Sequence, residues 1–451
     1  MIEKVLIANR GEIAVRIIQA CREMNIRSVA VYSNVDKDSL HVKLADEAVC
    51  IGDHKIENSY LNMNAIIQTA INLGVDAIHP GYGFLSEKAE FAKMCEDCNI
   101  EFIGPKSQSI KLMGHKGNAR KEMVKANVPV VKGYDKQIKD SKHAIEIAQE
   151  IGCPIIIKAV AGGGGKGMKI AHSLDEVEYL YNLAQSESIK AFNDGTMYIE
   201  QFIQNPRHIE VQILADKYGN AVHLFERECS MQRNNQKLIE EAPANNLSSA
   251  TRDKLYQVSL DATKEINYES AGTIEFIMDE FENFYFIEMN TRIQVEHPIS
   301  EQISGIDIIK EQLSIASNKE LSFKQDDIKI NGHAIEVRIN AEDAYNNFTP
   351  SCGKIDSLYF PTGLGIRIES FIYHNYVLLP YYDSMLAKVI VHGRNRKEAL
   401  AKITRSLEEI DIEGIKTNID FQLDIVLSKA FINGKYNTNF VSLFLEGDID
   451  V

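Results

Sequence analysis

The chain has 451 residues, of which 45% are hydrophobic and 25% charged, and its formal net charge at pH 7 is −15. This composition is ordinary for a soluble globular protein and excludes disorder as the starting assumption. The negative charge would repel a phosphate backbone, so we expect no nucleic-acid partner. No run of about 18 apolar residues occurs, so we expect no membrane-spanning segment either.

The N-terminus and the cysteines both indicate a cytoplasmic protein. Glu3 and Lys4 lie where a signal peptide would have its apolar region. The seven cysteines are scattered and odd in number, which favours reduced thiols. Cys95 and Cys98 form one C-x-x-C, but a zinc site needs four ligands, so we interpret this pair as structural.

Short β-branched runs alternate with helical periodicity over roughly the first 110 residues, which predicts βαβ units and a parallel, doubly wound sheet. The predicted strands are 5–8, 28–32, 48–51, 76–78 and 101–103, and the predicted helices include 13–24 and 61–73. A dinucleotide-binding fold needs G-x-G-x-x-G at the first strand-to-helix turn, where only Gly11 is present. We therefore exclude NAD binding.

The rest of the chain reads as two further α+β domains. Strands 155–159 and 168–171 predict a hairpin within a lid of about residues 132–202. Later strands are predicted at 209–214, 272–278, 284–289, 333–339, 365–369 and 385–392, with a helix at 396–409. The predicted domains are 1–113, 114–330, which contains the lid, and 331–447.

A glycine-rich loop, residues 161–168, joins the two strands of the lid hairpin. Five of the six residues 162–167 are glycine, so backbone N–H groups can approach an anion closely. It is not a Walker A loop, because Lys166 is followed by Gly167 and a strand. We interpret it as a mobile phosphate cradle; the alternative is a flexible turn, which would need fewer glycines.

Two lysines are candidate phosphate ligands. Lys158 ends the apolar strand of residues 154–159, where a cation needs a partner such as phosphate. Lys116 lies just before a predicted helix. Most lysines are solvated surface groups, so Lys158 is the stronger candidate.

A predicted hairpin places two carboxylates face to face. In a symmetric hairpin centred between residues 281 and 282, Glu275 opposes Glu288, with Cβ atoms about 5 Å apart. A divalent cation would resolve their repulsion, and Asn290 shares the face of Glu288 as a third oxygen ligand. Hard oxygen donors suit Mg²⁺ or Mn²⁺ on nucleotide phosphates; the alternative is an exposed acidic pair.

The segment 291–298 follows this hairpin directly. In an extended conformation Arg292, Gln294 and Glu296 would project to one side. A guanidinium beside a carboxylate can hold a small planar oxyanion while the carboxylate removes its proton. An ordinary ion pair is the alternative, which the position beside the hairpin disfavours.

Together these motifs resemble the ATP-grasp enzymes and, within them, the biotin carboxylases, over essentially the whole chain. The resembling stretches are residues 7–14, 79–87, the glycine loop, 226–233, 288–298, 333–342 and 381–385. The resemblance implies a doubly wound N-terminal domain, an ATP-grasp domain with a mobile lid and a C-terminal biotin carboxylase domain. It also implies ATP- and bicarbonate-dependent carboxylation of biotin through carboxyphosphate, the first half-reaction of acetyl-CoA carboxylase in fatty acid synthesis.

The resemblance assigns roles to individual residues. It implies that ATP is contacted by Lys116, Lys158, Gly163, Gly164, Gly165, Lys166, Glu200, Gln201, Phe202, Ile203, His208, Gln232 and Asn235. It implies that Glu275, Glu288 and Asn290 bind Mg²⁺ or Mn²⁺, and that Lys237, Arg292, Gln294 and Val295 contact bicarbonate. Glu296 would then be the base that deprotonates bicarbonate, and Arg338 would stabilise the biotin enolate.

The resemblance also implies partners. No biotin-carrier turn of the Met-Lys-Met type is recognised, so biotin is expected on a separate carrier protein, with a separate carboxyltransferase and a homodimer interface near residues 16–23 and 363–367. Two positions depart from the family. Asn235 replaces the usual His, which argues against a proton relay there, and Ala161 stands where Gly or Ser is common.

Two other functions are alternatives to biotin carboxylation. Another ATP-grasp ligase, as in purine or carbamoyl-phosphate synthesis, would share the lid and the metal hairpin but would not respond to biotin. A catalytically silent nucleotide-binding regulator would not need the full set of candidate residues that this chain carries.

Overall fold

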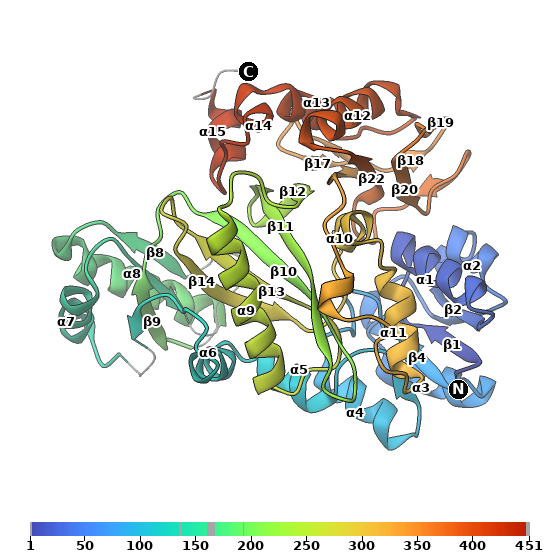
Figure 1. The fold of residues 1–451 in the computed structure, drawn as a ribbon, viewed down its shortest axis with the longest axis horizontal. Helices are drawn as coiled ribbons and strands as arrows, with labels where there is room; N and C mark the ends of the chain where they lie inside the picture. Colours follow the sequence, from blue (N-terminus) through green and yellow to red (C-terminus); the bar gives the residue numbers. More distant parts are fainter. Residues whose placement is uncertain (1, 135–137, 160–166, 193, 448–451) are drawn as a thin grey trace.

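A computed structural model describes residues 2–134, 138–159, 167–192 and 194–447. The polypeptide forms an N-terminal lobe, a small lobe that extends to one side, and a large body built on one long sheet (Figure 1). Among the described residues, no helix combines the length and the apolarity that crossing a membrane requires.

The N-terminal lobe contains a five-stranded sheet in the order β3-β2-β1-β4-β5, with every pair parallel. Its elements are β1 (Lys4–Ile7), α1 (Gly11–Glu23), β2 (Arg27–Ser33), α2 (Leu40–Leu44), β3 (Glu47–Gly52), α3 (Met63–Leu73), β4 (Ala77–His79), α4 (Ala89–Asp97), β5 (Glu101–Phe102) and α5 (Ser107–Met113). Val5 and Ile7 pack in the same core as α1, whereas Leu6 packs in the core of α3 and α4. Helices therefore cover both faces, which confirms the doubly wound prediction.

The loop after β4 is tied to the end of β1. The Asn9 side-chain amide donates to the carbonyls of Pro80 and Tyr82, at 2.7 Å each. Gly81 between them has φ +61°, and a Cβ there would lie 2.9 Å from the Asn9 amide nitrogen, so only glycine fits without strain. This arrangement places the 79–87 loop at the carboxyl edge of the parallel sheet, the usual position of a ligand site in such folds.

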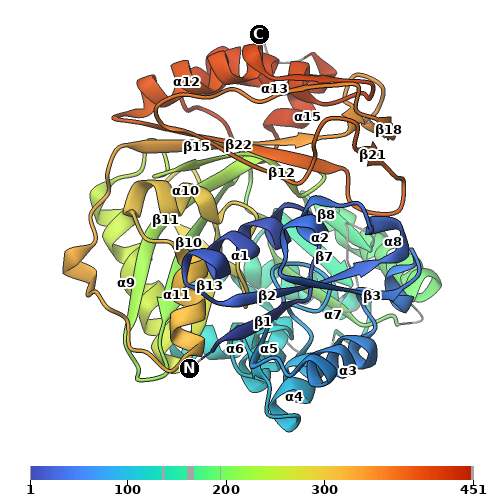
Figure 2. The same cartoon turned by 90° about the vertical axis from the view of Figure 1, so that its right-hand side faces the viewer.

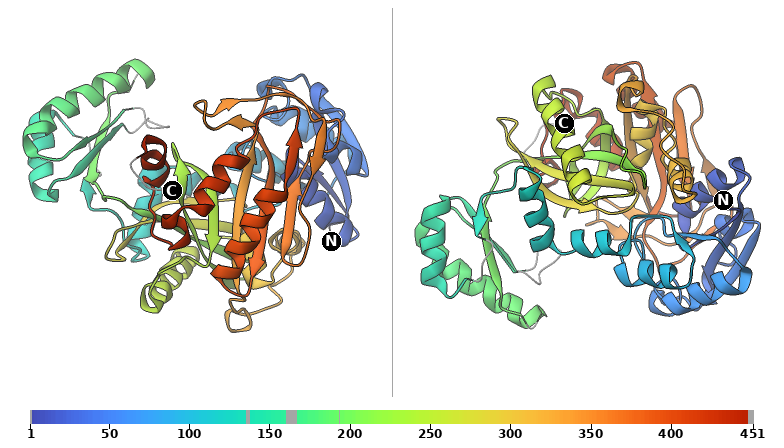
Figure 3. Two further views of the ribbon diagram at one scale, coloured as in Figure 1. Left: turned by 90° about the horizontal axis from the view of Figure 1, so that it is seen from above. Right: turned by 60° about the horizontal axis from the view of Figure 1, so that its bottom comes forward.

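The small lobe has its own sheet and its own core. Its elements are β6 (Gly133–Tyr134), α7 (Ser141–Ile151), β7 (Ile155–Ala159), β8 (Met168–Ala171), α8 (Leu174–Phe192) and β9 (Met197–Gln201), with strand order β6-β9-β7-β8. The predicted β7–β8 hairpin is confirmed, and α7 and α8 pack together. Viewed from above, the lobe stands away from the rest of the molecule (Figure 3). Residues 160–166, most of the glycine loop, lie outside the described residues.

One eight-stranded antiparallel sheet runs through the large body in the order β14-β13-β10-β11-β12-β15-β22-β20. The strands are β10 (Arg207–Ala215), β11 (Ala221–Arg233), β12 (Gln236–Ala242), β13 (Ser270–Met278), β14 (Phe284–Asn290), β15 (His333–Asn340), β20 (Ile366–Ser370) and β22 (Met385–Gly393). Because β12 pairs with β15, this sheet is continuous across the domain division predicted at residue 330.

Helices flank this sheet. They are α6 (Lys116–Lys125), α9 (Ser249–Glu265), α10 (His297–Ser304), α11 (Ile308–Ala316), α12 (Arg396–Glu409), α13 (Ile419–Leu427), α14 (Lys429–Ile432) and α15 (Phe440–Glu446). Figure 2 shows α12 and α13 on the side of β15 and β22 that faces away from the N-terminal lobe. Short ladders pair β16 (Glu342–Asp343) with β17 (Thr349–Pro350), β18 (Gly353–Lys354) with β21 (Val377–Leu378), and β19 (Ser357–Tyr359) with β23 (Asp411–Glu413).

The two faces of β15 differ in polarity. Ile335, Val337 and Ile339 pack in the core that includes α12 and α13. The alternate residues Glu336 and Arg338 belong to the opposite face, because successive side chains point to opposite sides of a strand. A charged layer therefore lies between the C-terminal sheet and the N-terminal lobe.

A buried carboxylate, Glu241 on β12, joins the central sheet to the C-terminal helices. It accepts hydrogen bonds from Arg396 Nε and His333 Nε2, both at 2.7 Å, and from the Tyr436 hydroxyl. Burial alone would raise the pKa of Glu241, but His333 and Arg396 outweigh it and lower the pKa from 4.5 to about 2. The carboxylate is therefore ionised at neutral pH.

We expect Glu241→Gln to lower the free energy of unfolding at pH 7 by about 1.5–3 kcal/mol, because hydrogen bonds to a charged group are lost. Since the pKa is lower in the folded state, this contribution is present above pH 4.5 and disappears as the pH falls toward 2. Urea unfolding of both proteins from pH 7 downward measures it. Glu320→Gln, at an exposed position, serves as the control, and a difference that does not shrink in acid would contradict the assignment.

Candidate active site

A cavity of about 1280 Å³ lies between the small lobe and the eight-stranded sheet. Every predicted site residue in the described part of the chain lines it: Lys116, Lys158, Glu200, Gln201, Phe202, Ile203, His208, Gln232, Asn235, Lys237, Glu275, Glu288, Asn290, Arg292, Gln294, Val295, Glu296 and Arg338. Gly163, Gly164, Gly165 and Lys166 lie outside the described residues. The structure thus gathers side chains that are up to 222 positions apart, from Lys116 to Arg338, around one space.

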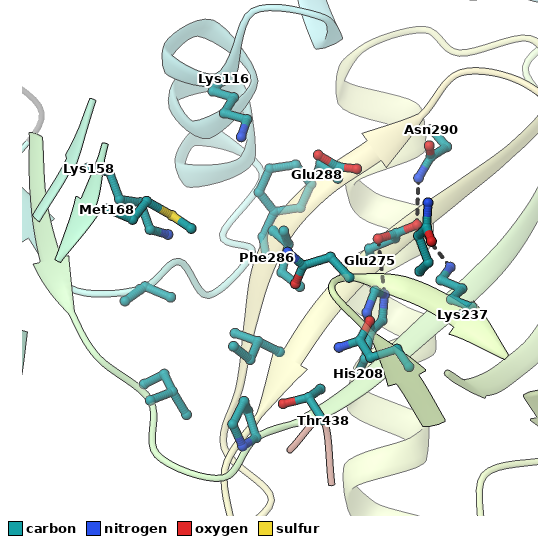
Figure 4. A pocket seen from close by; sticks show the side chains of 18 of the residues that line it. Lys116, Lys158, Met168, His208, Lys237, Glu275, Phe286, Glu288, Asn290 and Thr438 are labelled. Atoms are coloured by element: carbon teal, nitrogen blue, oxygen red, sulfur yellow. Dashed lines mark hydrogen bonds and ion pairs between the residues drawn. The ribbon is translucent and has the colours of Figure 1, made fainter. Parts of the chain in front are cut away.

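Two lysines face the sheet from the other side of the cavity (Figure 4). Lys158 lies on β7 and forms an ion pair with Glu200 on the neighbouring strand β9. Lys116 is the first residue of α6, whose N-terminus is capped by the His115 ring. The half-buried cation on the apolar strand therefore has a carboxylate partner, and the two predicted ATP contacts Lys158 and Glu200 touch each other.

The acidic hairpin is confirmed, with one irregularity. Glu275 on β13 pairs with Glu288 on β14, but Phe276 pairs with Phe286, so Ile287 is an extra residue that forms a bulge. The turn is therefore centred on residue 281 rather than between 281 and 282. The bulge restores the register, and the two carboxylates remain cross-strand partners.

The environment of the pair fits a divalent cation. Burial opposes ionisation of Glu275, but Lys237 and His208 outweigh it and hold its pKa well below the usual range. Burial, together with the charge of Glu275, raises the pKa of Glu288. A divalent cation bound between the two carboxylates would remove the energetic cost of ionising Glu288. Two carboxylates and an amide oxygen are the hard donors that Mg²⁺ and Mn²⁺ accept.

Asn290 lies at the centre of a hydrogen-bond network. Its side-chain N–H donates to Glu275 at 2.6 Å, and its carbonyl oxygen accepts from Arg292 at 2.9 Å. Gln294 also donates to the same Glu275 oxygen, at 2.7 Å. A cation that uses the Asn290 oxygen would therefore take the place of the Arg292 contact.

Glu296 is held between two cations. Lys237 Nζ lies 2.5 Å from one carboxylate oxygen, and Arg338 Nη2 lies 2.9 Å from the other. Burial alone would raise the pKa of Glu296, yet Lys237, Arg338 and Arg227 together hold it well below its usual value. Glu296 is therefore an ionised carboxylate, the form in which a base accepts a proton.

The 291–296 segment is not a strand but an irregular loop that ends in a turn. Arg292, Gln294 and Glu296 nevertheless all line the cavity. Glu87, in the 79–87 loop, supports them: it accepts from the Thr291 backbone N–H at 3.1 Å and from Arg292 Nε at 2.9 Å. Sequence reasoning assigned no role to Glu87, and the only signal for it was its place in a stretch resembling the family.

A fully buried arginine, Arg227 on β11, donates hydrogen bonds to several residues beneath the site. Sequence reasoning did not predict it. It donates to Glu210 and Gln212 at 2.6 Å each, to Ser300 at 3.0 Å, to Thr273 at 3.1 Å, and to Gln294. Lys237 contacts the other oxygen of Glu210 at 2.6 Å. The only sequence signal for Arg227 was its place in residues 226–233, a stretch that resembles the family.

Several other cavity residues were not predicted. They are His115, Arg120, Met168, Tyr198, Arg233, Glu342, Phe348, Asp383, Ser384, Met385, Thr438 and Asn439. Arg233 lies over the Phe348 ring at 4.0 Å, a cation–π contact. It connects the β11–β12 hairpin to the loop after β16.

Asn235 lies in the two-residue turn of the β11–β12 hairpin. Asn234 and Asn235 have φ values of +50° and +64°. Asparagine tolerates this left-handed conformation better than most residues, and two such residues define a hairpin turn of type I′. The turn is thus well specified by its sequence, while the histidine usual in the family is replaced by an amide that does not titrate.

Three family models match successive parts of the chain. "Biotin carboxylase, N-terminal domain" matches residues 1–110, "Carbamoyl-phosphate synthase L chain, ATP binding domain" matches 115–324, and "Biotin carboxylase C-terminal domain" matches 336–443. The fold and the cavity are accordingly those of an ATP-dependent ligase of the ATP-grasp class.

Similar proteins narrow this class. "Biotin carboxylase 1" of Bacillus subtilis is 51% identical, over 98% of this chain and 99% of that protein. A crystal structure of a biotin carboxylase–βγ-ATP complex from Campylobacter jejuni has a TM-score of 0.93 and 48% identity, covering 98% of this chain and 99% of that one. The biotin carboxylase domain dimer of Hydrogenobacter thermophilus 2-oxoglutarate carboxylase, with MgADP, ADP and bicarbonate, has a TM-score of 0.92 and 48% identity, covering 98% and 97%. The chain belongs to the biotin carboxylase family.

Proposed function

We propose that this chain is the biotin carboxylase component of an acetyl-CoA carboxylase and supplies carboxybiotin for fatty acid synthesis. Its substrates are MgATP, bicarbonate and biotin carried on a protein. The observation that carries the biotin carboxylation reaction is Glu296, an ionised base held between Lys237 and Arg338 and linked through Lys237 to the Glu275–Glu288 pair. The MgADP and bicarbonate in the Hydrogenobacter structure support it.

The first step needs a base and an anion site. Glu296 removes the bicarbonate proton while Lys237 and Arg292 hold the anion. The bicarbonate oxygen then attacks the γ-phosphorus of ATP, and the bond to the β-phosphate oxygen breaks, giving carboxyphosphate and ADP. Glu275, Glu288 and Asn290 would hold a divalent cation, which would supply neutralisation of the charge on the phosphates. Lys116 and Lys158 face the same space, and positioning and charge neutralisation supply most of the acceleration.

The second step transfers the carboxyl group. Carboxyphosphate separates into CO₂ and phosphate, and the phosphate removes the proton of the biotin ureido nitrogen. The nitrogen anion attacks the carbon of CO₂ to give carboxybiotin. Arg338, part-buried between Glu240 at 2.7 Å and Glu296 at 2.9 Å, stabilises the negative charge of the biotin enolate. Closure of the lid over the cavity would keep carboxyphosphate away from water, which destroys it.

Partners form part of the proposal. We infer a separate carrier protein and a separate carboxyltransferase, because two relatives that are each 48% identical are named as single subunits of larger carboxylases. We also infer a homodimer through residues 16–23 and 363–367. Within this region Leu364 is 92% exposed, and a large exposed apolar side chain of this kind is typical of a surface that a partner covers. The scattered cysteines support a cytoplasmic location.

ADP release by the purified chain tests the proposal. We expect release from MgATP to require bicarbonate and to rise when free biotin is added. If bicarbonate is needed but biotin changes nothing, the chain is another ATP-grasp ligase. If neither matters, the proposed reaction is wrong.

A second candidate is the carboxylation of a 2-oxo acid, favoured by the 48% identity to the Hydrogenobacter enzyme. The first half-reaction would be the same, so this chain alone does not distinguish the two. The native complex, purified through a tag on this chain, should carboxylate acetyl-CoA when given ATP and bicarbonate. Carboxylation of pyruvate or 2-oxoglutarate in place of acetyl-CoA would favour the second candidate.

Replacing Glu288 tests the cation site. Changes in residues that only support metal ligands typically cost about 10–100-fold in metal affinity, so we expect Glu288→Gln to raise the Mg²⁺ or Mn²⁺ concentration for half-maximal activity by at least about 10-fold. ADP release titrated with each metal measures this shift. Glu282→Gln, in the turn of the same hairpin, is the control, and an unchanged metal requirement in Glu288→Gln would contradict the assignment.

A further inference from the structure

Lys388 on β22 is a buried cation that has no part in the mechanism described above. It lies close to the 291–296 segment, here called the bicarbonate loop because it carries the proposed bicarbonate contacts. The Lys388 side chain is 0% exposed. The ammonium lies 2.7 Å from Glu369 and 3.3 Å from Glu12, and it donates a hydrogen bond of 2.8 Å to the Val295 carbonyl. A buried ammonium with a direct contact to the residue before Glu296 can affect the base without touching substrate.

Strand pairing explains how Lys388 reaches this loop. Glu369, Lys388 and Arg338 are directly opposite one another on the neighbouring strands β20, β22 and β15. Arg338 reaches the side chain of Glu296, and Lys388 reaches the carbonyl of Val295. Two adjacent cations of the sheet therefore hold two successive residues of the loop.

Three carboxyl groups surround the single positive charge of Lys388. Glu12 from α1, Glu369 from β20 and Glu336 from β15 face it, and His297 from α10 lies near the same group. Tyr82 donates to Glu12. Burial raises the pKa of Glu336 well above its usual value, with Lys388 acting against this effect. The carboxylates alone compensate the lysine charge, so the contact with Val295 is not required for charge balance.

We propose that Lys388 is a positioning residue that holds the Val295 carbonyl and thereby fixes the placement of Glu296 for bicarbonate deprotonation. The peptide unit is planar, so a fixed carbonyl at residue 295 also fixes the backbone from which the Glu296 side chain starts. Through Glu12 and Tyr82 the same lysine connects the loop to the N-terminal lobe. This inference rests on the proposed role of the loop in bicarbonate binding.

Three variants separate positioning from charge balance. Lys388→Met removes both the charge and the hydrogen bond to Val295. Lys388→Met with Glu12→Gln also removes the carboxylate that would otherwise lose its cation partner, because Glu12 pairs with Lys388 whereas Glu369 keeps Arg367. Lys4→Met is the control, because the Lys4 ammonium also combines a carboxylate contact, to Glu47 at 2.8 Å, with a hydrogen bond to a carbonyl, that of Leu73 at 2.9 Å, and it lies outside the cavity. Bicarbonate- and ATP-dependence of ADP release are measured for each.

We expect kcat/KM for bicarbonate to fall by about 10-fold to 100-fold, the cost of misplacing a reacting group by up to an ångström, in both Lys388 variants. The KM for ATP should stay at the wild-type value, and adding Glu12→Gln should recover thermal stability without recovering kcat/KM for bicarbonate. Lys4→Met should leave both constants unchanged.

Two results would overturn the inference. One is recovery of kcat/KM for bicarbonate in the double variant, which would make Lys388 a charge-balancing residue only. The other is an equal loss of the bicarbonate and ATP constants, in proportion to lost folded protein. If the wild-type chain itself releases ADP without needing bicarbonate, the proposed function fails instead, and the two failures are thus distinguished.

Discussion

Glu296→Gln is expected to lower kcat for bicarbonate-dependent ADP release by about 100-fold to 10,000-fold, the usual contribution of a general base. The KM for bicarbonate should not rise. Lys237, Arg338 and Arg292 remain to hold the anion, and the negative charge that repels it is gone. Steady-state rates at saturating MgATP, measured over a range of bicarbonate concentrations, give kcat and the KM for bicarbonate separately.

The exposed turn of the metal hairpin supplies the control for this prediction. Glu280→Gln makes the same chemical change between β13 and β14, at an exposed residue, and should retain wild-type kinetics. Glu296→Gln should also still bind MgADP, which a thermal shift measures. Retention of most of the wild-type kcat would show that another group takes the bicarbonate proton.

Arg227→Met is expected to lower the free energy of unfolding by about 3–5 kcal/mol, the cost of breaking a buried ion pair from one side. Arg227 and its partner Glu210 are both 0% exposed. Methionine fills much of the volume but donates nothing, so Gln212, Thr273 and Gln294 lose a partner as well. Urea unfolding followed by circular dichroism measures the change.

A surface arginine provides the comparison. Arg394 is 91% exposed and pairs with Glu398 four residues on, a kind of pair worth about 0.3–0.5 kcal/mol. Arg394→Met should therefore be close to wild type. Similar effects at Arg227 and Arg394 would contradict the role assigned to the buried network.

Local patterns in the sequence predicted much of the fold and most of the site. The alternation of Val5 to Ile7 with the helix that follows predicted a parallel unit, because burial on both faces of a sheet leaves a continuous apolar run. The pairing of Glu275 with Glu288 followed from hairpin symmetry. It held only because the bulge at Ile287 compensates a turn shifted by half a residue, and no residue type in that stretch signals a bulge.

The missed residues depend on contacts between distant parts of the chain. Arg227 meets Gln294 and Ser300, which are 67 and 73 positions away, and Glu87 meets Arg292 across 205 positions. Lys388 lies in the middle of a correctly predicted strand, where one lysine reads as a solvated residue. Only the neighbouring strands show that it is enclosed by carboxylates. The hydrophobic periodicity of a strand or helix shows which of its faces is buried, but it does not show which residues pack against that face.

The continuous eight-stranded sheet has a consequence for how such an enzyme can be altered. It carries the acidic pair on β13 and β14 and the cations Arg338 and Lys388 on β15 and β22. These two cations hold the loop that contains the base Glu296, so the groups keep their mutual geometry as one unit. The small lobe, in contrast, has a separate core. It is therefore a natural module for exchange between relatives: a chimera that replaces residues 132–202 changes the nucleotide contacts while the proton-transfer half of the site is inherited intact.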